Sequence, residues 1–399
     1  MQHEIALIET LAAALAIALV CGLIAARLRL PPLVGYLVAG ISIGPFTPGY
    51  VGDARVASQL AEIGVILLMF GVGLHFSARD LLAVRWVAIP GAAIEIALVT
   101  SAGIGLAEWW GWNLQSGLLF GLSLSVASTV VLLRAFEARG LLTSEPGRLA
   151  IGWLVVEDLF TVLLLVALPA LAGGIDAAPR VLLLTLAKVG AFVAVMLVVG
   201  GRVLPWVLAQ IQRTGSRELF TLAVVAIGLG IGYATAELLG LSYALGSFFA
   251  GVVLNGSDYG ARATKQIEPL QDIFVVLFFV SVGMLVDPMV LVQQPLHVAA
   301  VVAVLMLVKP AIAWTALRLL GRPAALAGVV AAGLAQIGEF SFILAALAVE
   351  LRLLPAEAQD LVLTGAMLAI TLNPLMFRLI APQTITPEPI MPEPITPVR

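Results

Sequence analysis

The stretch Gly152-Trp-Leu-Val-Val-Glu-Asp-Leu-Phe-Thr161 places two adjacent carboxylates, Glu157 and Asp158, in the middle of an apolar run over residues 147–172. A helix of this length is sufficient to cross the roughly 30 Å hydrocarbon core of a bilayer. A charge at the centre of such a helix costs about 2.5–3.5 kcal/mol. The stretch therefore predicts a transmembrane helix whose two carboxylates have a function.

The composition of the whole chain also indicates a membrane protein. Of its 399 residues, 61% are hydrophobic and only 11% are charged, against about 25% charged in an average soluble domain. The 21 Lys and Arg and the 24 Asp and Glu residues are too few to cover a water-soluble particle of this size. This composition excludes a soluble domain, a nucleic-acid-binding protein and a disordered chain, and it makes the lipid bilayer a partner.

The apolar runs predict an all-α polytopic membrane protein with about thirteen transmembrane helices. They cover approximately residues 5–26, 32–45, 57–75, 84–108, 115–138, 147–172, 180–208, 217–238, 241–255, 270–286, 297–320, 324–350 and 358–380. The second and the ninth runs are short and contain glycine, so their ends are the least well defined.

The charges in the loops predict the orientation of the chain. With the N-terminus outside and the C-terminus in the cytoplasm, sixteen Lys and Arg residues fall on the inner side, and the outer loops hold only Arg55, Arg180 and Arg352. Because cytoplasmic loops carry an excess of positive charge, this asymmetry supports both the odd number of helices and the orientation.

Two pairs of stretches repeat along the chain. Residues 35–45 are similar to residues 246–256, with Ala-Gly at the same place in both, and residues 66–74 are similar to residues 276–284. The two offsets are 211 and 210 residues, so the spacing is kept as well as the pattern. An odd number of helices between the copies would invert the second one, and inverted repeats are typical of secondary transporters. Chance similarity between glycine-rich apolar stretches is the alternative.

The repeat predicts the organisation of the chain. A transmembrane domain over residues 1–381 would contain repeat one at about 1–175, a linking helix at about 180–208 and repeat two at about 215–381. Residues 382–399 are rich in proline and repetitive, and we expect a disordered cytoplasmic tail there.

Six charged residues fall inside apolar segments: Glu95, Glu157, Asp158, Lys188, Lys309 and Glu339. Glu157 and Asp158 are about 100° apart around a helix, so both can border one cavity. Repulsion and desolvation favour a proton on at least one of them. A carboxylate of this kind can hold either a proton or a small cation, and a structural ion pair between helices is the alternative.

Partners for the remaining embedded charges are less certain from the sequence. Lys309 is followed by Pro310, which interrupts regular helix bonding, and we expect it to pair with Glu157 or Asp158, with snorkelling as the alternative. Snorkelling is the expectation for Lys188. Glu95 has no evident partner, so a packed, protonated carboxyl and a secondary site both stay open.

Two polar stretches occupy equivalent positions in the two repeats. They are Ser123–Thr129 and Ala335–Ser341, and the second contains Glu339. Small and hydroxyl-bearing residues allow a helix to unwind, and the freed carbonyls and hydroxyls can then line a polar cavity. The two stretches therefore predict a binding site, and helix packing by small residues is the alternative.

The chain resembles the Kef-type potassium/proton branch of the monovalent cation:proton antiporter superfamily, and within it the YbaL-like transporters. The resemblance covers residues 30–376 and is carried by Pro32–Leu37, Gly64–His75, Ala127–Leu133, Gly152–Asp158, Gly215–Phe220, Phe278–Met284 and Gln336–Phe340. It implies thirteen helices in a six-plus-six inverted repeat, with a core domain and a dimerisation domain. It also implies two crossed, broken helices around Ser128–Thr129 and Gln336–Glu339.

The resemblance also assigns site residues. The family's ion-binding aspartate maps onto Asp158 and its core lysine onto Lys309. The residue before the aspartate is often Gln in Kef proteins and Asp in electrogenic sodium/proton relatives, but it is Glu157 here. This departure leaves the choice between K⁺ and Na⁺ and the proton stoichiometry open. Kef proteins usually carry a cytoplasmic nucleotide-binding domain, and its absence from this sequence leads us to expect a truncated form or regulation by a separate subunit.

These observations predict a secondary antiporter that exchanges a monovalent cation, K⁺ before Na⁺, for protons. Asp158 would bind the cation and the proton in turn, and Glu157 would pair with Lys309 when the cation is absent. Further oxygen atoms would come from the site-lining residues Ser128, Thr129, Gln336 and Glu339. The expected assembly is a homodimer in a bacterial inner membrane.

Other functional classes fit the sequence less well. A gated monovalent cation channel is the alternative, although no stretch resembles a selectivity filter. We expect neither an enzyme nor a bound cofactor or metal, because the three histidines, His3, His75 and His297, are scattered along the chain.

Overall fold

The computed structural model of the chain describes residues 2–28, 30–75, 78–142, 144–172, 178–241 and 243–380, and the predicted proline-rich tail over 382–399 lies outside them. Within these ranges the chain is mostly helical and contains no β-strand. This architecture confirms the predicted all-α fold class. In lipid, a helix satisfies its backbone hydrogen bonds within one segment, which an open sheet cannot do.

Each predicted apolar segment coincides with helical structure. In chain order the elements are α1 (Gln2–Arg27), α2 (Pro32–Ile43), α3 (Ala54–His75), α4 (Ala78–Trp109), α5 (Leu114–Ser125), α6 (Thr129–Glu137), α7 (Glu145–Ala172), α8 (Ala178–Val195), the π-helix η2 (Met196–Gly200), α9 (Gly201–Gln212), α10 (Arg217–Leu239), α11 (Tyr243–Asn255), α12 (Gly260–Met284), α13 (Val290–Gln293), α14 (Pro295–Ala303), the π-helix η3 (Val304–Val308), α15 (Lys309–Leu319), α16 (Ala324–Leu334), α17 (Glu339–Glu350) and α18 (Ala356–Ile380). Helix α12 begins at Gly260, ten residues before the predicted start at residue 270. The prediction began late because the first turns of the helix carry charged residues, which lower the hydropathy of that stretch.

Nine helices in the described part of the chain are long and apolar enough to cross a membrane, or ten when α16 and α17 are taken as one bent span. Two shorter apolar helices, Pro32–Ile43 and Leu245–Asn255, lie in the two segments with the least well defined predicted ends. The polytopic membrane fold is thus confirmed, whereas the total of thirteen spans stays a prediction.

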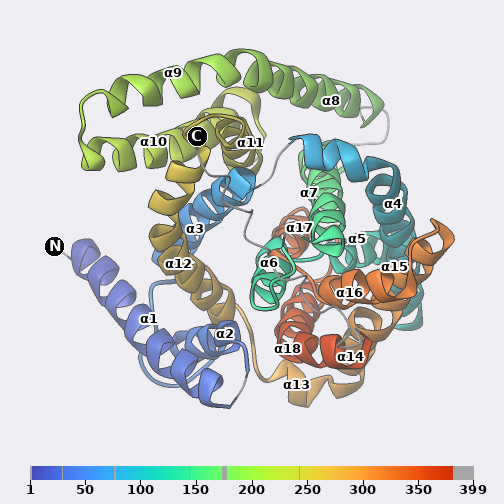
Figure 1. Cartoon of the computed structure of the whole chain (residues 1–399). Coiled ribbons are helices and arrows are strands. Elements are labelled where there is room, and N and C mark those ends of the chain that lie inside the picture. Colours follow the sequence, from blue (N-terminus) through green and yellow to red (C-terminus); the bar gives the residue numbers. More distant parts are fainter. Residues whose placement is uncertain are drawn as a thin grey trace.

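The helices form two groups (Figure 1). In the first group, α3 packs against α11 and α12, α2 packs against α1 and α12, and α10 packs against α11. In the second group, α4 packs against α5, α7 and α15, and α16 and α17 pack against α18. Helices α8 and α9, drawn in green along the top of Figure 1, connect α7 of the second group to α10 of the first.

Glycine contacts relate the two copies of the repeat. Gly40 on α2 lies so close to the carbonyl of Val280 on α12 that a Cβ would overlap it, and Gly251 on α11 lies in the same way against the carbonyl of Phe70 on α3. The repeat offsets of 211 and 210 map Gly40 onto Gly251 and Phe70 onto Val280. The glycine of repeat one therefore contacts repeat two at the same position at which the equivalent glycine of repeat two contacts repeat one. This supports the predicted division into repeats, which stays a prediction.

Two helices are interrupted where the polar stretches were predicted to unwind. Helix α5 ends at Ser125 and α6 begins at Thr129, and Val126 and Ser128 between them have extended backbones. The pair α16 and α17 is bent by 46° around residues 335–338. The amide of Gly338 donates to the carbonyl of Val126 at 3.2 Å, so the two interruptions cross each other. The predicted crossed, broken helices are confirmed.

The distribution of polarity is that of a membrane protein. Large apolar side chains such as Leu19, Trp206 and Leu238 are exposed, whereas Glu95, Glu157 and Lys309 are fully buried. In water this arrangement would leave apolar surface uncovered, but in a bilayer the lipid covers it and the charges face the interior of the bundle.

Candidate functional site

Asp158 lies on α7 beside the first helix interruption. Its Oδ2 atom accepts a hydrogen bond of 3.0 Å from the hydroxyl of Thr129, the first residue of α6. Its Oδ1 atom is buried and has no hydrogen-bond partner among the described residues. Because buried polar atoms are nearly always paired in native structures, an unpaired carboxylate oxygen marks a position for a proton or a cation.

Glu339 reaches the same interruption from the other side. It is the first residue of α17, and its Oε2 atom accepts a long hydrogen bond of 3.5 Å from the hydroxyl of Ser128. Its Oε1 atom is a second buried oxygen without a partner in the described structure. Ser128 and Thr129 are consecutive, so Asp158 and Glu339 flank one turn of the chain. Two carboxylates, two hydroxyls and two helix N-termini therefore meet at the crossing.

Gln336 holds the crossing together. Its side-chain oxygen accepts from the amide of Ser128 at 2.8 Å, and its side-chain nitrogen donates to the Ser128 carbonyl at 3.1 Å. The Ser128 carbonyl also accepts from the amide of Leu132 at 3.1 Å within α6, so the Gln336 side chain supplies the acceptor for the Ser128 amide and a second donor to its carbonyl. Both the oxygen and the nitrogen of the Gln336 side-chain amide are bound to backbone groups, so in this structure the side chain stabilises the crossing.

Lys309 and three other residues form a buried cluster behind the crossing. The Lys309 ammonium donates to the carbonyl of Gln336 at 3.0 Å and lies 3.9 Å from Glu95 Oε1. Glu157 accepts from the amide of Ala127 at 2.8 Å and from the indole N–H of Trp153 at 3.0 Å. In the described structure the carboxylate that lies within 4 Å of the Lys309 ammonium is that of Glu95, and the charge of Glu157 attracts the ammonium as well. The predicted pairing of Lys309 with Glu157 or Asp158 stays a prediction.

The helix irregularity predicted at Lys309 is present. The π-helix η3 ends at Val308, directly before Lys309 and Pro310. Proline lacks the amide that a regular helix would use there, and short π-helical turns are frequent at functional sites. Lys188 is not part of the cluster, because its ammonium donates to the carbonyl of Leu239 at the end of α10, at 3.0 Å.

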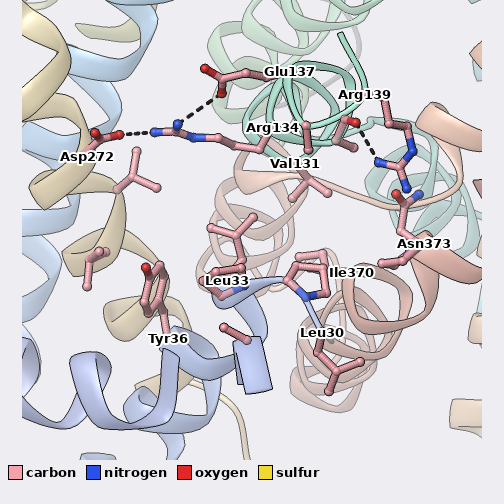
Figure 2. Close-up of a pocket in the computed structure, with 18 of the residues that line it drawn as sticks. Leu30, Leu33, Tyr36, Val131, Arg134, Glu137, Arg139, Asp272, Ile370 and Asn373 are labelled. Carbon is pink, nitrogen blue, oxygen red and sulfur yellow. Dashed lines mark hydrogen bonds and ion pairs between the residues drawn. The ribbon is translucent and has the colours of Figure 1, made fainter. Parts of the chain in front are cut away.

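A cavity of about 1140 Å³ lies between the two helix groups (Figure 2). Its wall contains Leu33 and Tyr36 on α2, Val131 and Arg134 on α6, and Asp272 on α12. A second cavity of about 410 Å³ shares Arg134 and Asp272 with the first. The linings of both reach α6 one or two residues from Thr129, and neither includes Asp158.

Arg134 connects the two groups across this cavity. Figure 2 shows its guanidinium between Asp272 on α12 and Glu137 on α6, and it forms ion pairs with both. At the far wall, Arg139 lies outside the membrane-spanning segments, with its guanidinium 4.0 Å from the centre of the Phe377 ring. Burial lowers the pKa of Arg139, and the positive charge of Arg378 adds to this effect.

The structure brings most of the predicted site residues together. Asp158, Ser128, Thr129, Gln336 and Glu339 meet at the crossing, and Glu157 and Lys309 lie directly behind it. Sequence reasoning missed Trp153, although its position four residues before Glu157 places both on one helix face.

The charge pairs Arg134–Asp272 and Lys309–Glu95 were also missed. Each joins residues more than a hundred positions apart, which no local pattern connects. The described residues contain no group of three or more His, Cys, Asp or Glu side chains placed to hold a metal ion.

Comparisons with known proteins agree on one family. The family described as "Sodium/hydrogen exchanger, transmembrane" matches residues 15–381. The chain is 53% identical over 387 residues to the putative cation/proton antiporter YbaL of Escherichia coli, covering 95% of this chain and 69% of YbaL. It is 33% identical over 384 residues to K(+) efflux antiporter 4 of Arabidopsis thaliana, covering 95% of this chain and 65% of that protein.

Two further matches extend the comparison. The glutathione-regulated potassium-efflux system protein KefC of Salmonella typhi is 34% identical over 322 residues, which cover 80% of this chain and 52% of KefC. The structure of the sodium proton antiporter MjNhaP1 from Methanocaldococcus jannaschii at pH 8 superposes with a TM-score of 0.67 and 17% identity, over 96% of this chain and all of that one. This likeness shows a common fold.

Proposed function

The chain belongs to the sodium/hydrogen exchanger family of transmembrane cation/proton antiporters, and from that premise we propose that it exchanges K⁺, or alternatively Na⁺, for protons with Asp158 as the shared carrier. The family consists of transporters rather than enzymes. A gated channel is not proposed, because the relatives whose names state an activity are antiporters or efflux systems.

The observation that carries the proposal is the Asp158 carboxylate. One oxygen is fixed by Thr129 at 3.0 Å, and the other is buried without a partner in the described structure. A proton and a dehydrated monovalent cation both complete such a group, and each excludes the other through its charge. Glu339, Ser128 and Thr129 supply further oxygen atoms for the cation. Competition of this kind converts a gradient of one ion into movement of the other.

The preference for K⁺ rests on the relatives. K(+) efflux antiporter 4 and KefC both carry potassium efflux in their names. The chain spans about half to two thirds of the length of these relatives. The presence of Glu157 before Asp158 keeps Na⁺ as the alternative ion.

Alternating access supplies the transport step in this proposal. The second helix group, which holds Asp158, would move against the first group, and the cavities beside α6 support such a boundary. The proposed setting is a homodimer in a bacterial inner membrane with the C-terminus in the cytoplasm. A regulatory domain or subunit would act from that side.

Transport in proteoliposomes tests the proposal. With a pH-sensitive dye inside, an outward gradient of K⁺ or Na⁺ should drive proton uptake by the wild-type protein. The apparent cation affinity should fall as the pH is lowered, because protons then occupy Asp158 more of the time. Asp158→Asn should abolish the exchange, whereas Asp258→Asn, in an exposed loop, should leave it unchanged. Exchange at the wild-type rate in the Asp158 variant would refute the carrier role.

A further inference from the structure

The larger cavity of Figure 2 has a mainly apolar lining that the exchange mechanism above does not use. Its volume of about 1140 Å³ exceeds the roughly 300–1,000 Å³ of most small-molecule sites. Both helix groups contribute aliphatic side chains to it: Leu15, Leu19 and Leu33 on α1 and α2, Ile273 on α12, Val131 on α6 and Ile370 on α18. The cavity therefore suits a ligand with a long apolar part.

The lining of this cavity reaches the surface of the molecule that faces lipid. Leu19 belongs to the lining and is 72% exposed, and Ile273 of the same lining is 48% exposed. Helix α1 is long and apolar enough to cross the membrane, and it ends at Arg27. Leu19 lies eight residues before that end, which corresponds to about 12 Å along a helix. A lipid chain can therefore enter the cavity at the depth of the hydrocarbon core.

The charged residues of the lining divide into a paired set and an unpaired set. Arg134 forms ion pairs with Asp272 and Glu137, the two carboxylate residues that line the cavity. Arg139 and Arg378 also line it, and neither has a carboxylate partner among the described residues. The two guanidinium charges lie close enough to repel each other. The lining therefore presents two neighbouring cations that lack a counter-charge.

These two arginines lie where α6 and α18 end, at the surface of the membrane. Arg378 is in the last turn of α18, directly after Phe377, and Figure 2 shows Arg139 on the opposite side of the cavity from Asp272. The Arg139 guanidinium lies 4.0 Å from the centre of the Phe377 ring, and its Nη1 donates to the carbonyl of Ala135 at 2.7 Å. Its other N–H groups have no partner in the part of the chain that the structure describes. They can therefore bind a phosphate, which arginine holds through two parallel hydrogen bonds.

We propose that this cavity binds an anionic phospholipid, with the phosphate at Arg139 and Arg378 and an acyl chain along the apolar lining toward Leu19. A negative headgroup and an apolar chain match the two parts of the lining, whereas a soluble anion would leave the apolar part without a partner. In the predicted orientation the two arginines face the cytoplasm, where the leaflet is negatively charged and basic pockets between helices hold such lipids. Because the lining belongs to both helix groups, the lipid binds and favours the arrangement of the groups that forms this cavity.

Lipid binding by the full chain in detergent, measured by native mass spectrometry, tests the site. The wild type should bind phosphatidylglycerol more tightly than phosphatidylethanolamine with the same chains, and Arg139→Gln/Arg378→Gln should weaken phosphatidylglycerol binding about tenfold or more. The control Arg202→Gln/Arg213→Gln removes two exposed arginines that do not line the cavity. Arg202, like Arg139, donates to the backbone carbonyl four residues before it. Equal binding of the two lipids by the wild type, or an equal loss in both double variants, overturns the proposal.

The melting temperature of the same protein distinguishes a lipid from a soluble anion. A ligand that binds only the folded protein raises this temperature. Phosphatidylglycerol should raise it for the wild type and much less for Arg139→Gln/Arg378→Gln, and glycerol phosphate, which carries the anion without the chains, should have no effect. Ile273→Trp keeps both arginines but enlarges a side chain of the lining, and it should also reduce the rise. A rise with glycerol phosphate equal to that with phosphatidylglycerol, or a full rise in the Ile273 variant, overturns the proposal.

Discussion

The hydroxyl of Thr129 fixes the position of the Asp158 carboxylate. It donates at 3.0 Å to one oxygen and leaves the other oxygen of Asp158 free to bind a ligand. Thr129 is also the first residue of α6, so the hydroxyl is held by a helix whose start is capped by Ser128, which accepts from the amide of Val131 at 3.3 Å. The geometry of the proposed carrier thus depends on a residue that carries no charge.

Thr129→Val tests this dependence. The variant keeps the branched shape but removes the donor, and a hydrogen bond to a charged group contributes about 1.5–3 kcal/mol. We expect the apparent KM for the transported cation to rise about tenfold or more, measured as cation-driven proton uptake in proteoliposomes. Thr129→Ser retains the hydroxyl and should stay close to wild type. Equal effects of the two substitutions would show that packing rather than the hydrogen bond matters.

At the scale of the elements, the site depends on how closely the two broken helices approach. A Cβ added to Gly338 would lie 2.6 Å from Ser128 Cα and 2.9 Å from Ser128 N, both backbone atoms that cannot move independently. The hydrogen bond from the Gly338 amide to the Val126 carbonyl lies at the same contact. A glycine at this position is therefore required by the crossing itself.

Gly338→Ala should separate the two interruptions. Overpacking of a close contact costs about 1–3 kcal/mol, so we expect a lower melting temperature in detergent and a large loss of exchange. Gly230→Ala is the matched control, because a Cβ at Gly230 within α10 meets no atom within 4 Å and alanine favours the helix. A Gly338 variant that transports normally would contradict the tight crossing.

The elements were predictable from the sequence to a much greater extent than the contacts between them. Long apolar runs must become helices in lipid, because no other local structure satisfies the backbone, and the stretch around Ser128 is polar enough to show where a helix opens. The contact between Lys309 and Glu95 was not predictable. The sequence offered Glu157 and Asp158 as neighbours in one conspicuous stretch, but which helix faces α15 is decided by packing. Glu95 on α4 is the residue that comes within 3.9 Å.

At the scale of the whole molecule, the proposed mechanism requires the two helix groups to move against each other at the boundary between them. Helix α6 packs against α7 and α16 of the second group, and it carries Thr129 as its first residue and Arg134 about one and a half turns further on. Arg134 forms its ion pair with Asp272 on α12 of the first group, across the cavity of Figure 2. The side chains of this pair are 41% and 62% exposed, so the ion pair contributes little to stability. It can therefore break and reform during transport at little cost.

A covalent link at this position tests whether the groups move. In a Cys21→Ser background, Arg134→Cys and Asp272→Cys place thiols where the ion pair joins α6 to α12, and a short bifunctional thiol reagent should then stop exchange almost completely. The control links Arg322→Cys to Glu145→Cys, which replace an ion pair of 3.2 Å between the connection that joins α15 to α16 and the start of α7, all parts of the second group. Because that link joins parts of one group, exchange should continue. Transport that persists after complete cross-linking of α6 to α12 would exclude movement of the second group against the first and would require the cation to reach Asp158 through a fixed scaffold.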